Sequence, residues 1–231
     1  MLTARSQEKE LLDLGPDYYT YEEYTQCLKK LFRVNKLFGF YRSTVKTLQY
    51  FANTSTLLDV GCGGGLFILH LNKIFPNMNM LGIDISTAAI DEAQHSLQTW
   101  QKNNPPIHVD FQLQEQIQLN LDTDSFNVIL ATLVCHHLSD AELIIFLQTI
   151  HRAASRVVII NDLQRHFLAQ WLYSLISPLL FRNRLITHDG IISIRRGFTR
   201  KEWQLLLHHA NIENYQLKWR FPFRWQLILS K

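Results

Sequence analysis

The stretch Leu57-Leu58-Asp59-Val60-Gly61-Cys62-Gly63-Gly64-Gly65-Leu66-Phe67 indicates how this chain folds. Residues 56–60 are apolar or β-favouring except for Asp59 and predict a strand, and an apolar helical pattern begins at Leu66. The glycines between them predict a tight turn, because glycine tolerates positive φ and lets a ligand lie against the main chain. A helix N-terminus adds free N–H groups and the positive end of a dipole. The stretch therefore predicts a strand, a turn and a helix that together bind a ligand.

A second strand that ends in an acid follows 19 residues beyond Gly65, in Leu81-Gly82-Ile83-Asp84-Ile85-Ser86. The dinucleotide fingerprint G-x-G-x-x-G needs a third glycine where this chain has Leu66, which disfavours a nicotinamide-dependent oxidoreductase. The glycine turn and this second strand, which ends in an acid, together resemble two motifs of the class I S-adenosylmethionine-dependent methyltransferases. The resemblance implies an enzyme of that class with S-adenosyl-L-methionine as its cofactor.

The resemblance also implies which residues contact the cofactor. Asp84 is expected to bind the ribose hydroxyls, Ile85 to pack on the adenine, and Asp59 to order the glycine turn. Glu115, which follows the third strand, aligns with an acid that hydrogen-bonds the adenine amino group in the family. Because ligands sit at the carboxyl ends of parallel strands, the end of the fourth strand is expected to face the cofactor as well. The remaining expected contacts are Gly61, Cys62, Gly63, Gly65, Gln116, Ala131, Thr132 and Leu133.

The fold implied by the resemblance is α/β: a Rossmann-like, doubly wound sheet of seven mostly parallel strands with a C-terminal antiparallel hairpin, plus N-terminal helices. Residues 1–54 are expected to form an N-terminal helical cap. Residues 55–231 are expected to form the methyltransferase domain, with a substrate-side insertion at about 163–198. Helical spacing within 21–51 predicts one or two helices, which either close over the cofactor or cover a sheet edge.

The candidate catalytic residues are histidines. Residues 136–138, His-His-Leu, are similar to a sequence just past the fourth strand of ubiquinone and menaquinone C-methyltransferases and their relatives. A phenol or an enolisable carbon profits from a general base, and histidine has an unperturbed pKa near neutrality. We expect His137 to be the catalytic base, with His166 as the second choice. Further candidates are His136, Asp162 and His188.

A metal site is not expected from the sequence, although Cys135 precedes the pair His136-His137. Neighbouring histidines are expected to point to different faces, and no cluster of partner ligands is evident along the chain. The three cysteines are odd in number, widely spaced and without a C-x-x-C pair, which argues against both a zinc site and a disulfide frame.

Composition narrows the class of protein. The 231 residues are 47% apolar and carry a formal charge of +3, so the charge balance does not predict a nucleic-acid partner. Charged residues within 1–14 argue against a signal peptide. The longest low-charge run, 167–181, is too short to span a bilayer, which takes roughly 20 apolar residues. A soluble cytoplasmic protein of undetermined oligomeric state is therefore expected.

The run 167–181 itself has two interpretations. It is expected chiefly to be an apolar helix buried against the sheet, but it could also form the wall of a lipophilic substrate pocket or rest on a membrane surface as a peripheral contact. Together with the basic residues around it, the run favours an apolar acceptor.

The predicted function is transfer of a methyl group to the oxygen or carbon of a small, apolar aromatic acceptor such as a phenol, a quinol or a polyketide. The alternative is a non-catalytic cofactor-binding partner subunit of the same fold. Two departures from the family pattern, Glu115 and Asn127, keep that alternative open.

Overall fold

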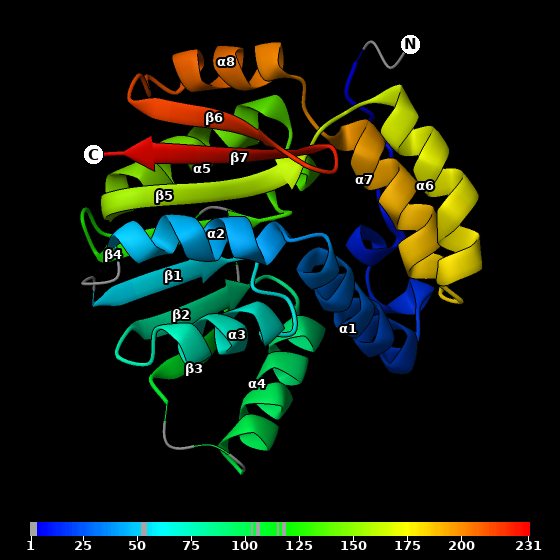
Figure 1. Ribbon diagram of the computed structural model, residues 1–231, viewed down its shortest axis with the longest axis horizontal. Helices are drawn as coiled ribbons and strands as arrows, with labels where there is room; N and C mark the ends of the chain where they lie inside the picture. Colours follow the sequence, from blue (N-terminus) through cyan, green and yellow to red (C-terminus); the bar gives the residue numbers. More distant parts are fainter. Residues whose placement is uncertain (1–3, 52–54, 103, 105–106, 115, 117–118) are drawn as a thin grey trace.

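The computed structural model describes residues 4–51, 55–102, 104, 107–114, 116 and 119–231. A seven-stranded sheet in the order β3-β2-β1-β4-β5-β7-β6 forms its centre (Figure 1). Strands β1 to β5 are parallel, and β7 runs antiparallel to both β5 and β6. The expected mostly parallel sheet with a C-terminal hairpin is confirmed. The strands are β1 (Thr56–Val60), β2 (Asn79–Asp84), β3 (Val109–Leu113), β4 (Phe126–Thr132), β5 (Ala154–Leu163), β6 (Tyr215–Arg220) and β7 (Arg224–Ser230).

Helices cover both faces of the sheet and one of its ends. The longer helices are α1 (Tyr21–Leu37), α2 (Phe40–Leu48), α3 (Leu66–Ile74), α4 (Thr87–Gln101), α5 (Asp140–Ala153), α6 (Phe167–Leu180), α7 (Gly190–Arg196) and α8 (Arg200–His209). The shorter helical turns are η1 (Leu11–Leu14), η2 (Pro16–Tyr18), η3 (Gln49–Phe51), η4 (Cys135–His137) and η5 (Leu185–Asp189). In Figure 1, α1, α6 and α7 gather beyond the carboxyl ends of the parallel strands.

Two apolar cores result from the alternation of side chains along the strands, because successive residues point to opposite faces. Leu57 and Val128 pack under α2, α3 and α4. Leu58 and Ile129 pack instead with α5 and α8.

The register of the strands brings their carboxyl ends to one rim. Val60, the last residue of β1, is level with Ile83 of β2 and with Ala131 of β4. Thr132, the last residue of β4, is level with Asn161 of β5. Residues that follow β1, β2, β4 and β5 therefore meet at this rim.

Helix α6 differs from the favoured expectation that it is buried against the sheet. Only Ala169 and Ser177 of its fourteen residues are buried. It packs on α7 and η5, while α8 occupies the sheet face through the buried Trp203. The prediction was wrong because apolar composition alone does not say which surface a helix covers. The exposed apolar residues of α6 are Phe167, Leu168, Trp171, Leu175, Ile176, Leu179 and Leu180.

Candidate active site at the carboxyl rim of the sheet

The glycine turn joins β1 to α3 and has the left-handed backbone that its sequence predicts. The φ angles of Gly61, Gly63 and Gly65 are +72°, +53° and +72°. A Cβ on Gly61 would collide with the side chain of Val134, and one on Gly65 would collide with the ring of Phe111. Both backbone angle and close packing therefore require glycine at these two positions.

Asp84 lies directly against this turn. One carboxylate oxygen, Oδ2, accepts a hydrogen bond from the backbone N–H of Gly63 at 2.9 Å, and Oδ1 accepts one from Ser86 at 2.9 Å. Burial raises the pKa of Asp84, and these backbone donors act in the opposite direction. Since a carboxylate offers about four lone-pair sites, the carboxyl group keeps capacity for a hydroxyl donor.

The other residues expected at the cofactor lie at the same rim or just beyond it. Ile85 is 63% exposed, and Cys62 is buried beneath the turn. Leu133 has a φ of +60°, and its N–H donates to the carbonyl of Asn161 at 2.8 Å. Ala131 is buried within β4, and the Thr132 hydroxyl accepts from the Asn161 amide at 3.4 Å.

Two of the expected adenine contacts follow β3. Gln116 is exposed, and its carbonyl accepts a hydrogen bond from the Gln114 side chain at 3.1 Å. Glu115 lies outside the described residues. The adenine end of the predicted site therefore remains a prediction.

Helix α1 lies over the glycine turn. The side chain of Leu28 comes within 3.5 Å of where a Cβ on Gly63 would be, and within 3.2 Å for Gly64. Of the two placements expected for the N-terminal helices, this contact matches the one that covers the turn. Residue Leu28 thus forms part of the wall around any ligand that binds the turn.

Two buried polar atoms at the rim have no hydrogen-bond partner among the described residues: Oδ1 of Asp59 and Nη1 of Arg224. Burial raises the pKa of Asp59 to about 8, with Asp84 adding to the effect. Burial lowers the pKa of Arg224 to about 10. The charge of Asp59 raises the pKa of the Tyr41 hydroxyl and the charge of Arg224 lowers it, so both groups lie near Tyr41. One unpartnered carboxyl oxygen and one unpartnered guanidinium nitrogen match the chemistry of an amino-acid ligand, which carries an ammonium and a carboxylate.

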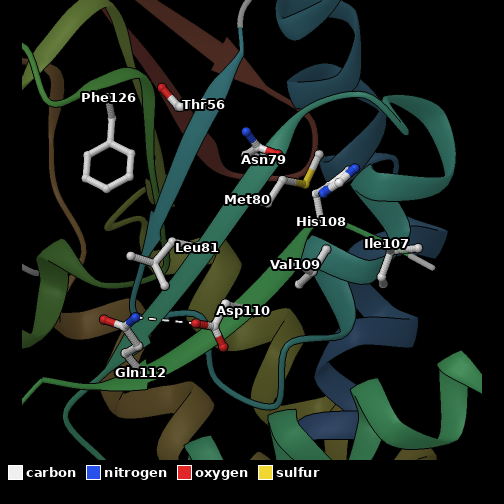
Figure 2. A pocket seen from close by; sticks show the side chains of 10 residues that line it. All are labelled: Thr56, Asn79, Met80, Leu81, Ile107, His108, Val109, Asp110, Gln112 and Phe126. Carbon is white, nitrogen blue, oxygen red and sulfur yellow. Dashed lines mark hydrogen bonds between the residues drawn. The ribbon is translucent and has the colours of Figure 1, made fainter.

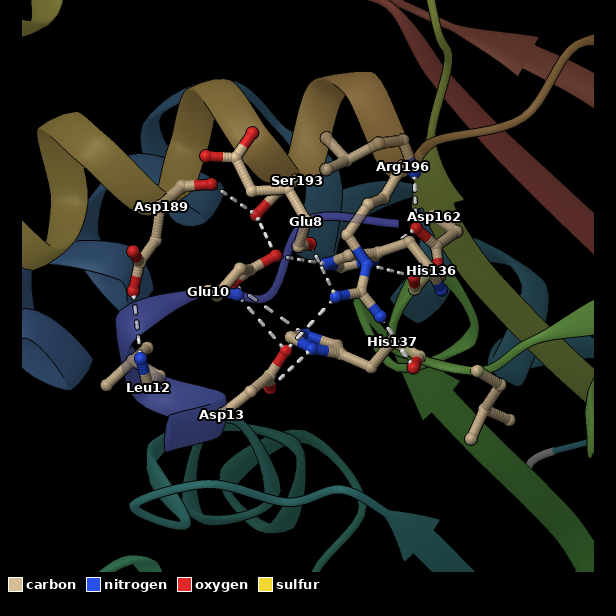
Figure 3. A network of polar contacts seen from close by, with 12 residues as sticks. Glu8, Glu10, Leu12, Asp13, His136, His137, Asp162, Asp189, Ser193 and Arg196 are labelled. Atoms are coloured by element: carbon tan, nitrogen blue, oxygen red, sulfur yellow. Dashed lines mark hydrogen bonds and ion pairs between the residues drawn. The ribbon is translucent and has the colours of Figure 1, made fainter. Parts of the chain in front are cut away.

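A polar network forms the second half of the rim (Figure 3). His136 is buried, and its Nδ1 lies 2.8 Å from Oδ1 of Asp162, at the end of β5. Its Nε2 faces Oε1 of Glu10 at 3.4 Å. Burial acts to lower the pKa of His136, but the carboxylates of Asp162 and Glu10 outweigh it and raise the value to about 9.

His137 lies beside His136, with ring centroids 4.2 Å apart. Its Nδ1 is 2.9 Å from Oδ1 of Asp13, and its Nε2 is 4.0 Å from Oε2 of Glu10. The expectation that these histidines point to different faces without partners was wrong. In η4 the chain turns tightly enough for both rings to lie on the same side, facing the N-terminal segment.

Two arginines hold η4 and the N-terminal segment together. Arg196, at the end of α7, donates to the carbonyls of His136 at 2.8 Å and His137 at 2.6 Å. Arg196 also donates to Oδ2 of Asp13 at 3.3 Å. Arg5 donates to the carbonyl of Leu138 at 2.8 Å. The guanidiniums thereby satisfy carbonyls that a short helical turn leaves free.

The other two candidate histidines make different contacts. His166 caps α6 by accepting the N–H of Leu168 at 3.2 Å, and its ring stacks on Phe167 and Phe223. His188 is paired with Asp189 at 2.9 Å. Of the two histidines expected to be catalytic, the structure places His137 in the polar network and gives His166 the contacts of a helix cap.

No sequence pattern indicated Glu10 and Asp13 as site residues, and the structure brings Asp13 to a histidine 124 positions away. Neither acid lies in a recognisable motif. Arg196 likewise sits in a segment with few predictive signals. Only the folding of the N-terminal segment onto α7 and η4 assembles these side chains.

Two cavities lie away from the rim. Figure 2 shows one of about 420 Å³ at the opposite end of the sheet, where Thr56, Asn79 and Val109 begin β1, β2 and β3. A second, of about 500 Å³, lies between α1, α3 and α4 and includes Lys29 and Glu92. Because ligands of such sheets bind outside the carboxyl ends of the strands, the rim is the better candidate site.

Comparison with known proteins finds a family that resembles part of the chain. A family described as methyltransferase domain matches residues 57–156. The match runs from β1 into β5 and includes both the glycine turn and the two histidines of η4. Residues 57–156, a little less than half of the chain, therefore resemble a methyltransferase domain.

The chain resembles one curated enzyme over part of its length. It is 29% identical over 105 residues to the malonyl-[acyl-carrier protein] O-methyltransferase of Legionella pneumophila. The similarity covers 46% of this chain and 33% of that enzyme, so the chain matches about a third of the relative.

Solved methyltransferases share the fold of the whole chain. Magnesium protoporphyrin IX methyltransferase from Synechocystis PCC 6803, with bound S-adenosylmethionine, has a TM-score of 0.63 at 16% identity, covering 98% of this chain and 99% of its own. Human N-acetylserotonin methyltransferase has a TM-score of 0.66 at 18% identity, covering 93% and 57%. The plantazolicin methyltransferase has a TM-score of 0.67 at 16% identity, covering 94% and 91%. At these identities the likeness shows the fold.

Proposed function

We propose that this chain transfers a methyl group from S-adenosylmethionine to a small, apolar aromatic acceptor. The observation that carries the proposal is the hydrogen bond between Asp84 and the backbone of Gly63, which fixes an acid against the glycine turn. When bound, the cofactor supplies an electrophilic methyl group on its sulfonium. The enzyme then chiefly has to orient the reactants and exclude water.

The residues at the rim fit the parts of this cofactor. Asp84 has lone pairs left for the ribose hydroxyls. Asp59 and Arg224, each with one buried unpartnered atom, are suited to the ammonium and carboxylate of the methionine portion. Leu28 covers the turn and would exclude water from a ligand there. Buried polar groups normally have hydrogen-bond partners, and a bound methionine portion would supply them for Oδ1 of Asp59 and Nη1 of Arg224.

We propose that the acceptor binds on the histidine side of the rim, where His137 acts on its hydroxyl. His137 is the more accessible of the two neighbouring histidines, with 30% of its side chain exposed against 3% for His136. Glu10 and Asp13 of the expected N-terminal cap and Arg196 of the expected insertion contact this side. The basic and apolar residues of the cap support an apolar acceptor that also carries a polar group.

The exposed face of α6 supports peripheral contact with a membrane. Leu179 is 81% exposed and Phe167 is 65% exposed, and the helix contains no charged residue. Arg182 follows it and is exposed as well. An apolar face beside basic residues suits the surface of an anionic bilayer. Among the described residues, no helix is both long and apolar enough to cross a bilayer.

Calorimetric titration tests the cofactor assignment. We expect the chain to bind S-adenosylmethionine but not NADH. The substitution Asp84→Ala should weaken the affinity for S-adenosylmethionine at least tenfold, since charge-assisted hydrogen bonds contribute about 1.5–3 kcal/mol. Asp91→Ala, an exposed acid on α4, is the matched control. Unchanged affinity in Asp84→Ala contradicts the ribose assignment. Binding without turnover on a library of phenols would favour the non-catalytic partner subunit instead.

A further inference from the structure

Two imidazoles and one carboxylate converge on one point at the rim. Nε2 of His136 is 3.4 Å from one carboxylate oxygen of Glu10, and Nε2 of His137 is 4.0 Å from the other. One donor atom from each of the three residues lies within 4.8 Å of the other two. Figure 3 shows the three side chains pointing toward one another from η4 and from the N-terminal segment. We propose that Glu10, His136 and His137 bind a zinc ion.

The distances suit a tetrahedral ion. Zinc binds imidazole nitrogen and carboxylate oxygen at about 2.0–2.2 Å, which places neighbouring ligand atoms roughly 3.4 Å apart in a tetrahedron. The separation between His136 and Glu10 already has this value. Nε2 of His137 lies 4.0 Å from the other oxygen of the same carboxylate, and its partly exposed side chain can approach by a small rotation.

Both histidines are held in the orientation that a metal ligand needs. Nδ1 of His136 lies 2.8 Å from Asp162, and Nδ1 of His137 lies 2.9 Å from Asp13. A carboxylate that accepts the Nδ1 proton leaves the lone pair on Nε2, and such partners accompany metal-bound histidines in most known sites. Two neighbouring histidines thus have the same arrangement, each with Nδ1 on an aspartate and Nε2 toward Glu10.

Glu10 is also fixed in place, and its surroundings favour a cation. The hydroxyl of Ser193 donates to Oε1 of Glu10 at 2.6 Å, and the residue is buried. The carboxylates of Glu10, Asp13 and Asp162 lie around the two imidazoles in the network drawn in Figure 3. Such a group of carboxylates favours a cation between them, and a bound divalent ion would take the place of the proton that Asp162 and Glu10 hold on His136.

Three protein ligands leave one tetrahedral position open. Sites with two histidines and one glutamate commonly hold water or substrate there, whereas closed structural sites use four protein ligands. On the basis of the proposed function, the open position would take the hydroxyl oxygen of the acceptor. His137 would then act on that hydroxyl through the ion instead of as a free base.

Metal binding can be measured without methyl transfer. The full chain is stripped with a chelator, dialysed against zinc, and analysed for bound metal; cobalt(II) substitution adds a visible absorption that reports tetrahedral coordination. We expect one ion per chain. His137→Ala should weaken zinc binding at least tenfold, and Asp13→Asn should weaken it by roughly 10–100-fold, as loss of an outer partner does in known sites.

His188→Ala is the matched control, because His188 also pairs with an aspartate but does not face Glu10. It should leave zinc binding unchanged. Circular dichroism establishes that the variants fold, and the partial exposure of His137 makes its variant the safer of the two histidine changes. Failure of the wild-type chain to bind one equivalent of zinc, or an equal loss in His137→Ala and His188→Ala, overturns the proposal. Titration with S-adenosylmethionine separates this outcome from failure of the proposed function.

Discussion

The two halves of the rim are assembled in different ways. On the glycine side, Asp84 contacts the backbone of Gly63, 21 positions away, and both residues belong to consecutive strand ends. On the histidine side, Glu10 and Asp13 meet His136 and His137 across more than half of the chain. The first half depends mainly on backbone atoms, and the second depends on charged side chains that neutralise one another.

This difference predicts different kinds of fragility. A site made by a turn should be damaged by changes that the backbone cannot accept. A site made by buried charges should be damaged by removal of any one partner, because the remaining charge is then buried alone. The following predictions test that contrast in order of decreasing effect.

Asp162→Ala should cause the largest loss of stability. It removes the carboxylate that holds Nδ1 of buried His136, and breaking a buried pair costs about 3–5 kcal/mol. Urea unfolding in the presence of a chelator measures the free energy without any contribution from bound metal. Asp91→Ala should change stability by less than about 0.5 kcal/mol. Equal effects of the two substitutions would show that the network does not stabilise the fold.

Asp59→Asn should make stability less dependent on pH. The folded pKa of Asp59, about 8, lies above its ordinary value of 3.8. Between these values the folded chain holds a proton that the unfolded chain has released, so the free energy of unfolding falls as pH rises, by at most about 1.4 kcal/mol per unit. The variant lacks this loss, and thermal melts from about pH 5 to 8 should show its advantage growing with pH. Parallel curves for the two proteins would contradict the buried, protonated acid.

Gly65→Ala should destabilise the glycine side by about 1–3 kcal/mol, because a Cβ meets Phe111 and φ is left-handed. Gly64→Ala is the control: that residue has no positive φ, and its nearest contacts are flexible side chains. Chemical denaturation of both variants measures the difference. Similar losses would mean that ordinary crowding, and not the turn conformation, requires glycine.

Leu179→Gln should have the smallest effect on folding, within about 0.5 kcal/mol, since its side chain is 81% exposed. The same change should reduce sedimentation with vesicles that contain phosphatidylserine. Leu205→Gln, another exposed leucine but on α8, serves as the control surface. Retention of vesicle binding by Leu179→Gln would remove α6 from the proposed membrane contact.

The sequence by itself determined the glycine side of the site. Gly61, Gly63, Gly65, Asp59 and Asp84 could be predicted because a strand, a turn and a helix form from local patterns of apolar and conformationally special residues. The mostly parallel sheet with its C-terminal antiparallel hairpin followed from the family that these motifs indicate. Residues such as Ile85 and Leu133 could be placed at the rim because they follow strands whose register is regular.

Only the tertiary structure decided the histidine side and the surface that α6 covers. Glu10, Asp13 and Arg196 carry no local pattern, because their roles arise from side-chain contacts between segments that are distant in sequence. The apolar composition of α6 is compatible with either burial or exposure, and the packing of α8 on the sheet leaves α6 outside. Secondary-structure propensity and hydrophobic periodicity depend on residues that are close in sequence, whereas charge pairing and helix placement depend on which segments meet in space.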